Sequence, residues 1–93
     1  MEKVKIMATD YKIEEVEQID KDRRILGEID YINQTIKLEK GLPNELKKEI
    51  LLHEILHGIL EKLGFDALNN DEQKVQSIAS TLYLVLKDNA NLM

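Results

Sequence analysis

Residues Ile50–Leu60 read Ile-Leu-Leu-His-Glu-Ile-Leu-His-Gly-Ile-Leu, and the only side chains among them that are not apolar are His53, Glu54 and His57. A helix that is apolar around its whole circumference is buried in a protein core. Burying two imidazoles and a carboxylate without polar partners costs several kcal/mol. The stretch therefore predicts a central helix, around which the fold is organised, with a polar site that has partners elsewhere in the chain.

The spacing of the two histidines indicates a metal. His53 and His57 are four residues apart, so on a helix their rings lie on one face, one turn apart. Two imidazole nitrogens in that position can both bind one Zn²⁺ at about 2.0–2.1 Å. Glu54 is turned about 100° from His53 around the axis, where it is a poor ligand but can reach a water beside the metal. This is the His-Glu-x-x-His pattern, in which the glutamate acts as general base.

A competing interpretation is that the two histidines only hydrogen-bond their neighbours in the core. The chain has two histidines in total, and both lie in this pattern with the glutamate between them. A single buried histidine would favour the competing interpretation, whereas this pair favours zinc.

Composition excludes several other kinds of site and partner. The chain has 93 residues, which predicts a single domain over residues 1–93, and it has no cysteine, so a metal site must use histidine and carboxylate. The net charge of −5 argues against a nucleic-acid partner. The first residues lack the long apolar run of a signal peptide, and no apolar run reaches membrane-spanning length. We expect a soluble, cytoplasmic protein.

Short apolar runs upstream of the central helix predict a small sheet. These runs, which alternate or are rich in β-formers, are residues 4–7, 11–16, 25–29 and 35–38. Asp30–Gln34 contains the Asp and Asn typical of a hairpin turn, and Ile36 and Leu38 should share one face of the return strand. The charged segment 18–24 should be an exposed turn.

Two helices should follow the sheet. The first begins near Pro43, with Asn44 as a possible cap, and ends at about Leu63 before Gly64. After a connection, a second helix runs from about Asp71 to Lys87, with Asn69 or Asn70 as its cap. Its expected core face consists of Val75, Ile78, Ala79, Leu82 and Leu86. The fold class is α+β: a small antiparallel sheet of three or four strands packed on two main helices.

A catalytic zinc site usually has three protein ligands and a water, so a third ligand is needed, and it must be a carboxylate. The candidates downstream are Glu61, Asp66, Asp71, Glu72 and Asp88. Glu72 is the best of them, because it precedes Val75 by three residues and Ala79 by seven and so lies on the expected core face. Asp71 is the alternative. Either acid also suits a helix N-terminus without any metal, where it offsets the helix dipole.

At these residues the chain resembles a known family. Leu52-His53-Glu54-Ile55-Leu56-His57, followed by Asp71-Glu72-x-x-Val75-x-x-Ile78-Ala79, looks like the ImmA/IrrE-type zinc metallopeptidases, gluzincins whose second helix supplies a glutamate ligand. Residues 26–30 and 35–38 resemble the small sheet of that family, and residues 88–92 are similar to the tail of phage-encoded members. The resemblance covers about residues 4–92. The short length resembles phage-encoded members and minigluzincins, and implies a minimal zincin core.

The resemblance implies a zinc metallo-endopeptidase. Zn²⁺ would be held by His53, His57 and Glu72, with Glu54 as the catalytic base and an extended protein or peptide substrate added to the edge of the sheet. Stabilisation of the oxyanion would come from one of four side chains, Tyr11, Tyr31, Arg23 or Arg24, with Tyr83 a poorer choice.

Two alternatives stay open. The first is a zinc-binding interaction or regulatory module of the same fold without peptidase activity, although Glu54 would have no use there. The second is a small α+β interaction domain without metal. The oligomeric state is left open by the sequence.

Overall fold

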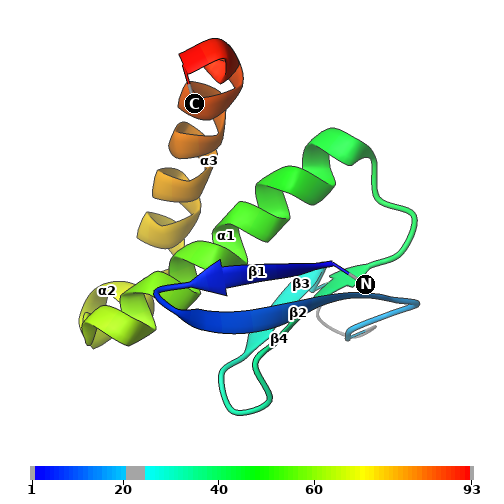
Figure 1. Ribbon diagram of the computed structural model, residues 1–93, viewed down its shortest axis with the longest axis vertical. Coiled ribbons are helices and arrows are strands. Elements are labelled where there is room, and N and C mark those ends of the chain that lie inside the picture. The colour runs from blue at the N-terminus through cyan, green and yellow to red at the C-terminus, as the bar shows by residue number, and fades with distance from the viewer. Residues whose placement is uncertain (1, 21–24, 93) are drawn as a thin grey trace.

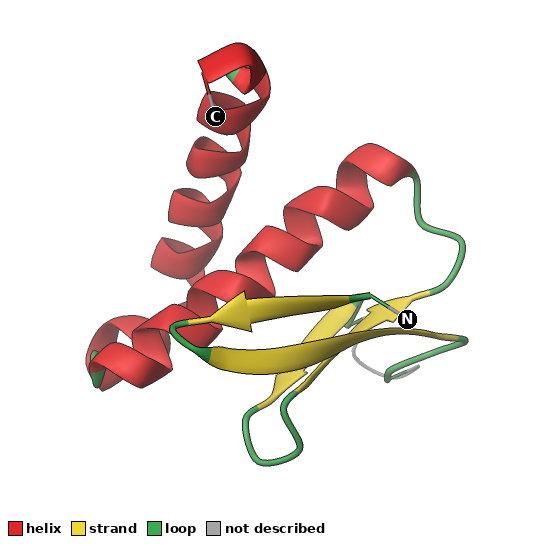
Figure 2. Ribbon diagram, viewed as in Figure 1, coloured by secondary structure: helices red, strands yellow, loops and turns green. Residues whose placement is uncertain are grey.

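The computed structural model describes residues 2–20 and 25–92, in which a four-stranded sheet is covered on one face by a long helix (Figures 1 and 2). The strands are β1 Lys3–Ile6, β2 Thr9–Val16, β3 Gly27–Asp30 and β4 Thr35–Glu39. Their order in the sheet is β1-β2-β4-β3. The pairs β1–β2 and β3–β4 are antiparallel, whereas β2 and β4 run parallel. The α+β class is therefore confirmed, and the sheet is mixed instead of wholly antiparallel.

The two faces of the sheet differ in polarity because side chains alternate along each strand. The register places Ile13 beside Ile36, and Ile36 and Leu38 are completely buried on the face that meets the helix, as the sequence predicts. The buried core cluster consists of Ile6, Tyr11, Ile36 and Leu38. On the opposite face, Asp10 forms exposed ion pairs with two lysines of β1, so that face is solvated.

The covering helix, α1, spans Asn44–Leu63. Its N-cap is Pro43, and no side chain caps it, so Asn44 is the first helical residue and not the cap. The helix ends at Gly64, whose left-handed φ of 75° costs a glycine nothing. Within residues 2–20 and 25–92, no helix is both long enough and apolar enough to cross a membrane.

Two glycines let α1 approach the sheet closely. A Cβ atom on Gly58 would lie 2.9 Å from Cδ1 of Ile6, and one on Gly27 of β3 would lie 2.4 Å from Cγ2 of Ile50. Neither position has room for a side chain without movement of its neighbour. The sheet therefore lies directly against the half of α1 that carries the histidines.

The segment after α1 contains more structure than the connection expected from sequence. Residues Asp66–Asn69 form the short helix α2, and α3 spans Glu72–Asp88. The cap of α3 is Asp71, whose side chain accepts a hydrogen bond from the Lys74 backbone N–H at 3.1 Å, so the prediction of Asn69 or Asn70 was wrong. A 3₁₀ turn, η1, follows at Ala90–Leu92.

The predicted core face of α3 is only partly correct. Val75 and Ala79 are buried, but Ile78 and Leu82 remain 42% and 39% exposed. The reason is that α3 packs on α1 and α2 and makes no extensive contact with the described strands. Figure 1 shows its C-terminal half extending away from the sheet. The apolar pattern of α3 is therefore wider than the surface that covers it.

Candidate metal centre

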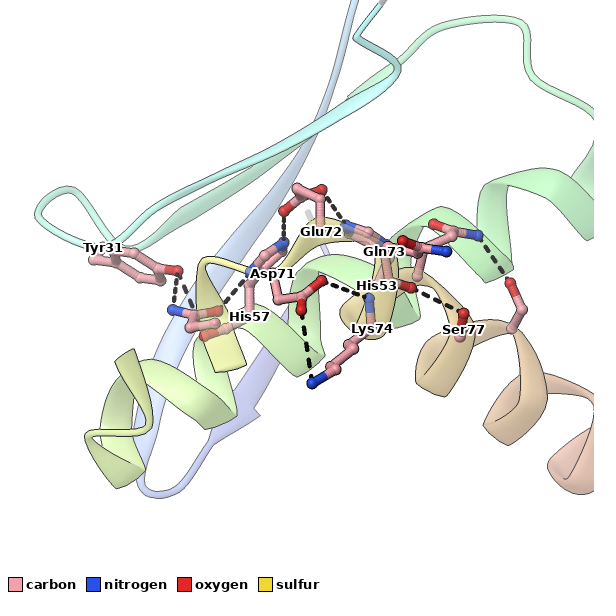
Figure 3. Close-up of polar contacts among 11 residues, drawn as sticks. Tyr31, His53, His57, Asp71, Glu72, Gln73, Lys74 and Ser77 are labelled. Carbon is pink, nitrogen blue, oxygen red and sulfur yellow. Dashed lines mark hydrogen bonds and ion pairs between the residues drawn. The ribbon is translucent and has the colours of Figure 1, made fainter. Parts of the chain in front are cut away.

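Three side chains from two helices converge on one point (Figure 3). His53 and His57 come from α1, and Glu72 is the first residue of α3. Nε2 of His53 lies 3.4 Å from one carboxylate oxygen of Glu72, and Nε2 of His57 lies 2.6 Å from the other. One ligand atom from each residue lies within 4.8 Å of the other two. Among the described residues this is the group that is suited to hold a metal ion.

The local structure explains why these side chains meet. The two imidazoles are one helical turn apart, with ring centroids separated by 4.8 Å and planes at 65°. The chain turns at the left-handed Gly64, where the N–H groups of Gly64 and Phe65 donate back to Glu61 and Leu60. The short α2 then leads into α3, whose first residue, Glu72, contacts both rings.

The donor set fits a small divalent cation. Two ligand atoms of a tetrahedral zinc, each about 2.0–2.1 Å from the ion, lie roughly 3.3–3.4 Å apart. The His53–Glu72 separation of 3.4 Å matches this value, and the His57–Glu72 separation of 2.6 Å is shorter. The three ligand atoms together span up to 4.8 Å, so the side chains must move to bind one ion. Glu72 can move to lengthen its contact with His57, since its side chain is 70% exposed whereas each histidine side chain is only 12% exposed.

A hydrogen-bonded chain behind His57 fixes which nitrogen faces Glu72. Asn69 of α2 donates through Nδ2 to the hydroxyl of Tyr31 at 3.2 Å, so its Oδ1 is left to accept from Nδ1 of His57 at 2.6 Å. The proton of a neutral His57 ring is therefore on Nδ1, and the lone pair of Nε2 points at the carboxylate. Two such electron-rich atoms 2.6 Å apart need a cation between them, either a proton or a metal.

Asn69 is the site residue that sequence reasoning missed. An acceptor bonded to the ring nitrogen that faces away from the metal fixes the orientation and tautomer of a metal-binding histidine. Asn69 lies twelve residues after His57 on a different helix, so no local spacing links the two. Its only signal in the sequence is its place in the polar segment Asn69-Asn70-Asp71, which by itself predicts a helix cap.

His53 has no such support. Its Nδ1 is buried and has no hydrogen-bond partner among the described residues. Leaving a buried polar atom unsatisfied costs about 1–3 kcal/mol. The His53 ring is therefore oriented by packing and by the contact of its Nε2 with Glu72, whereas the His57 ring is also held by a hydrogen bond from its Nδ1 to Asn69.

Glu54 lies on a different face of α1, as its position in the motif predicts. The residue is only 7% exposed, and its side chain lies against β3, with Oε2 3.3 Å from the place of a Cβ on Gly27. Burial raises the pKa of the Glu54 carboxyl to about 7. The positive charge available at His57 opposes this rise, and the carboxylates of Glu72 and Glu28 add to it. Glu54 is not one of the three ligand residues.

The remaining carboxylate candidates do not join the cluster. Asp71 is occupied by its cap to α3 and by an ion pair with Lys74 at 3.8 Å. The described residues that could share one metal ion are His53, His57 and Glu72, and this group includes none of Glu61, Asp66, Asp71 and Asp88. Of the candidates weighed from sequence, Glu72 is the one that the fold brings to both histidines.

The tyrosines proposed for oxyanion stabilisation have other roles. Tyr11 is 2% exposed within the core. The Tyr31 hydroxyl accepts from Asn69 and donates to the backbone oxygen of His57 at 3.4 Å, and Figure 3 places it beyond His57 on the side away from His53. Tyr83 donates to Glu45 at the far end of α1. Arg23 and Arg24 lie outside the described residues.

Comparisons with known proteins add no relative to this picture. No family model, curated protein or solved structure matches the chain. The features that bear on function are therefore the residues themselves: two histidines one turn apart, a glutamate from a second helix that contacts both, and a buried glutamate on the same helix as the histidines.

Proposed function

We propose that this chain is a zinc-dependent metallo-endopeptidase of the ImmA/IrrE type, which hydrolyses peptide bonds in a protein or peptide substrate. The observation that carries the proposal is the contact of Glu72 with both His53 and His57, next to a buried Glu54. This donor set, two histidines and a glutamate, leaves a fourth tetrahedral position for water or substrate. The absence of cysteine fits action in a reducing compartment such as the cytoplasm.

Each residue has a distinct role. His53, His57 and Glu72 would hold the ion, and Asn69 keeps the proton of His57 on Nδ1. When bound there, zinc supplies Lewis-acid polarisation of the scissile carbonyl and lowers the pKa of a water to about 7.

Glu54 is suited to move the proton. A general base works best when its pKa lies near the operating pH, and burial raises the pKa of Glu54 to about 7. Glu54 accepts a proton from the attacking water and then donates it to the leaving amine. The protein therefore needs no other acid to protonate the leaving amine when the peptide bond breaks.

The sheet offers a place for the substrate backbone. β3 is an edge strand that pairs with β4 alone among the described strands. An extended peptide can add to such an edge through main-chain hydrogen bonds. Gly27 of this strand lies close to Glu54, which supports a substrate bound beside the proposed base.

Two measurements test the proposal. Protein purified without added metal should contain about one zinc per chain by elemental analysis, in keeping with a three-ligand site. The zinc-loaded chain should cleave members of a fluorescence-quenched peptide library. Glu54→Gln should abolish cleavage while keeping zinc, because it preserves the size of the side chain and removes the base. Cleavage that persists in the Glu54→Gln chain would refute the role of Glu54.

A second candidate function is a zinc-binding interaction or regulatory module of the same fold. It is favoured by one observation: the three tyrosines considered for the oxyanion are engaged elsewhere. The same assay separates the candidates. A module would bind zinc in stoichiometric amount and cleave no peptide in the library, with or without the Glu54→Gln change.

A further inference from the structure

A row of exposed apolar side chains runs along α3, away from the metal centre. Ile78, Leu82 and Val85 are 42%, 39% and 45% exposed, and we refer to these three residues as the α3 stripe. They follow one another at spacings of four and three residues. This is the spacing of the a and d positions that meet a partner helix in a coiled coil.

The stripe borders the face that packs on α1. With about 100° per residue, Ile78 and Val85 lie roughly 60–80° around α3 from Val75, and Leu82 lies only about 20° from it. Val75 and Ala79 are fully buried. The described elements with extensive contacts to α3 are α1 and α2. The stripe is therefore an unpartnered helix face, adjacent to a helix–helix contact that already exists.

We infer that the α3 stripe pairs with the α3 stripe of a second copy of this chain, with the two helices antiparallel. Apolar stripes of equal width are self-complementary, which is the condition for a two-fold symmetric interface. Figure 1 shows the sheet near the N-terminal end of α3 and the other end projecting from it. Antiparallel pairing therefore puts the two sheets at opposite ends of the helix pair.

Charge complementarity selects the antiparallel direction. Lys74 and Asp88 flank the stripe on its side away from α1, fourteen residues apart. When Leu82 packs against Ile78 of the second copy, Lys74 comes to within about 3 Å along the axis of the second copy's Asp88. Symmetry makes this pair twice. Parallel pairing would leave the same two charges about 21 Å apart.

The charges are free to form these pairs. Asp88 makes no ion pair within residues 2–20 and 25–92 in the described structure. Lys74 is paired only loosely with Asp71, at 3.8 Å, and its side chain is 71% exposed. An exposed pair at that distance exchanges at little cost.

The interface predicts a weak dimer. α3 has 17 residues, or about 26 Å of helix, and three apolar side chains per copy. A contact of this length with three apolar side chains per copy buries less area than a tight, obligate interface does. We expect a dissociation constant on the order of tens of micromolar.

Sedimentation equilibrium of the full chain tests the inference. Measured from about 5 µM to about 1 mM, both without and with EDTA, the protein should pass from monomer to dimer. Leu82→Lys should weaken the dimer at least about tenfold, because it buries a charge in the contact. The matched control is Leu84→Lys, which makes the same change on α3 at a residue that is 54% exposed and off the stripe, and which should leave the constant unchanged.

Three outcomes would overturn the inference. A chain that stays monomeric throughout this range needs another partner for the stripe. A dimer that disappears in EDTA is bridged by metal, for instance at the exposed Glu72, and a dimer equally insensitive to both lysine variants uses another surface. Thermal melting by circular dichroism shows whether the Leu82→Lys chain is folded.

Exchanging the flanking charges tests whether the two helices are antiparallel without changing any residue of the α3 stripe. This test applies even if the Leu82→Lys chain does not fold. Lys74→Glu alone and Asp88→Lys alone should each weaken the dimer roughly tenfold, because each places two like-charged pairs across the interface. An equimolar mixture of the two variants should restore the original affinity, since both cross-pairs are then of opposite sign. A mixture no stronger than either variant would rule out antiparallel pairing.

Discussion

The two helices that form the candidate metal centre contribute to it in opposite ways. α1 lies against β1, β3 and β4, and the side chains of His53 and His57 are 12% exposed. Among the described elements, α3 has its extensive contacts with α1 and α2, and the side chain of Glu72, its first residue, is 70% exposed. One half of the site is thus held by the core, and the other half reaches it from solvent.

The histidine half of the site is therefore rigid, and the Glu72 half can move. The histidines keep their spacing because they are one turn apart on the same helix, and α1 cannot shift on the sheet without disturbing the contacts of Gly27 and Gly58 with their neighbours. Glu72 has the freedom to lengthen its short contact with His57 when an ion enters. The core-held half should therefore dominate metal affinity, and changes on the α3 side should have smaller effects.

The largest expected effect is loss of zinc from a change in the core-held half. His53→Ala removes one of two ligands on a single helix face, so we expect no stoichiometric zinc and a lower free energy of unfolding, measured by elemental analysis and urea titration. Glu72→Ala is the matched change in the exposed half. It should bind zinc more weakly and leave the unfolding of the metal-free chain nearly unchanged. Stoichiometric zinc in the His53→Ala chain would show that the ligand assignment is wrong.

The next effect concerns Glu54 and its dependence on pH. Its carboxyl has a pKa of about 7 when folded and about 4.5 ordinarily, so the folded chain binds the proton more tightly than the unfolded chain does. For the metal-free protein, stability from this group is full below about pH 4.5, falls as pH rises, and is lost above about pH 7, by roughly 3 kcal/mol in total.

Urea unfolding in EDTA at several pH values measures this loss. The side chain at position 54 cannot titrate in the Glu54→Gln chain. The free energy of unfolding of this variant should therefore rise relative to that of the wild type as pH increases from about 5 to about 8. The comparison of the two chains at each pH removes the contribution of the histidines. A constant difference between them would show that the carboxyl titrates normally.

The third effect tests the close approach of sheet and helix. Gly27→Ala places a Cβ about 2.4 Å from Cγ2 of Ile50, so α1 and β3 must separate. Overpacking of this kind costs roughly 1–3 kcal/mol, which chemical denaturation will show. Gly41→Ala is not a suitable control because of its φ of 82°. Ser80→Ala is a milder helical substitution at a half-buried position of α3, where it removes the acceptor of one surface hydrogen bond from Gln76. It should change stability by less than about 0.5 kcal/mol.

The elements that can be predicted from sequence follow the same division of the molecule. α1 was predicted to within a residue at its C-terminus, because Gly64 and the dense apolar pattern are local signals. The parallel pairing of β2 with β4 was not predicted, since it joins segments some twenty residues apart that carry no common turn. The exposed side of α3 was assigned to the core, because periodicity shows which residues share a face but not what covers that face.

The fourth effect lies on the boundary between the two halves. Asn69→Ala removes the acceptor that holds the proton of His57 on Nδ1. Loss of such a partner typically weakens metal binding roughly 10- to 100-fold, which competition with a zinc-binding dye can measure. Tyr31→Phe is the control one step further out, and it should have a smaller effect because Asn69 remains. Equal effects from both would place the essential contact at the Tyr31 hydroxyl.

The smallest expected effect decides between the two neighbouring acids at the start of α3. Asp71→Ala removes a side-chain cap, so it should lower the free energy of unfolding by about 1 kcal/mol and leave zinc affinity within a factor of two or three of the wild type. Glu72→Gln should do the reverse, because Glu72 contacts both histidines and caps nothing. Urea unfolding and zinc titration should be measured on both variants. Asp71→Ala should lose more stability than Glu72→Gln, and Glu72→Gln should lose more zinc affinity than Asp71→Ala. If Asp71→Ala lost more zinc affinity than Glu72→Gln, the carboxylate that binds the ion would be the cap residue, and α3 would have to begin one residue later whenever the site is loaded.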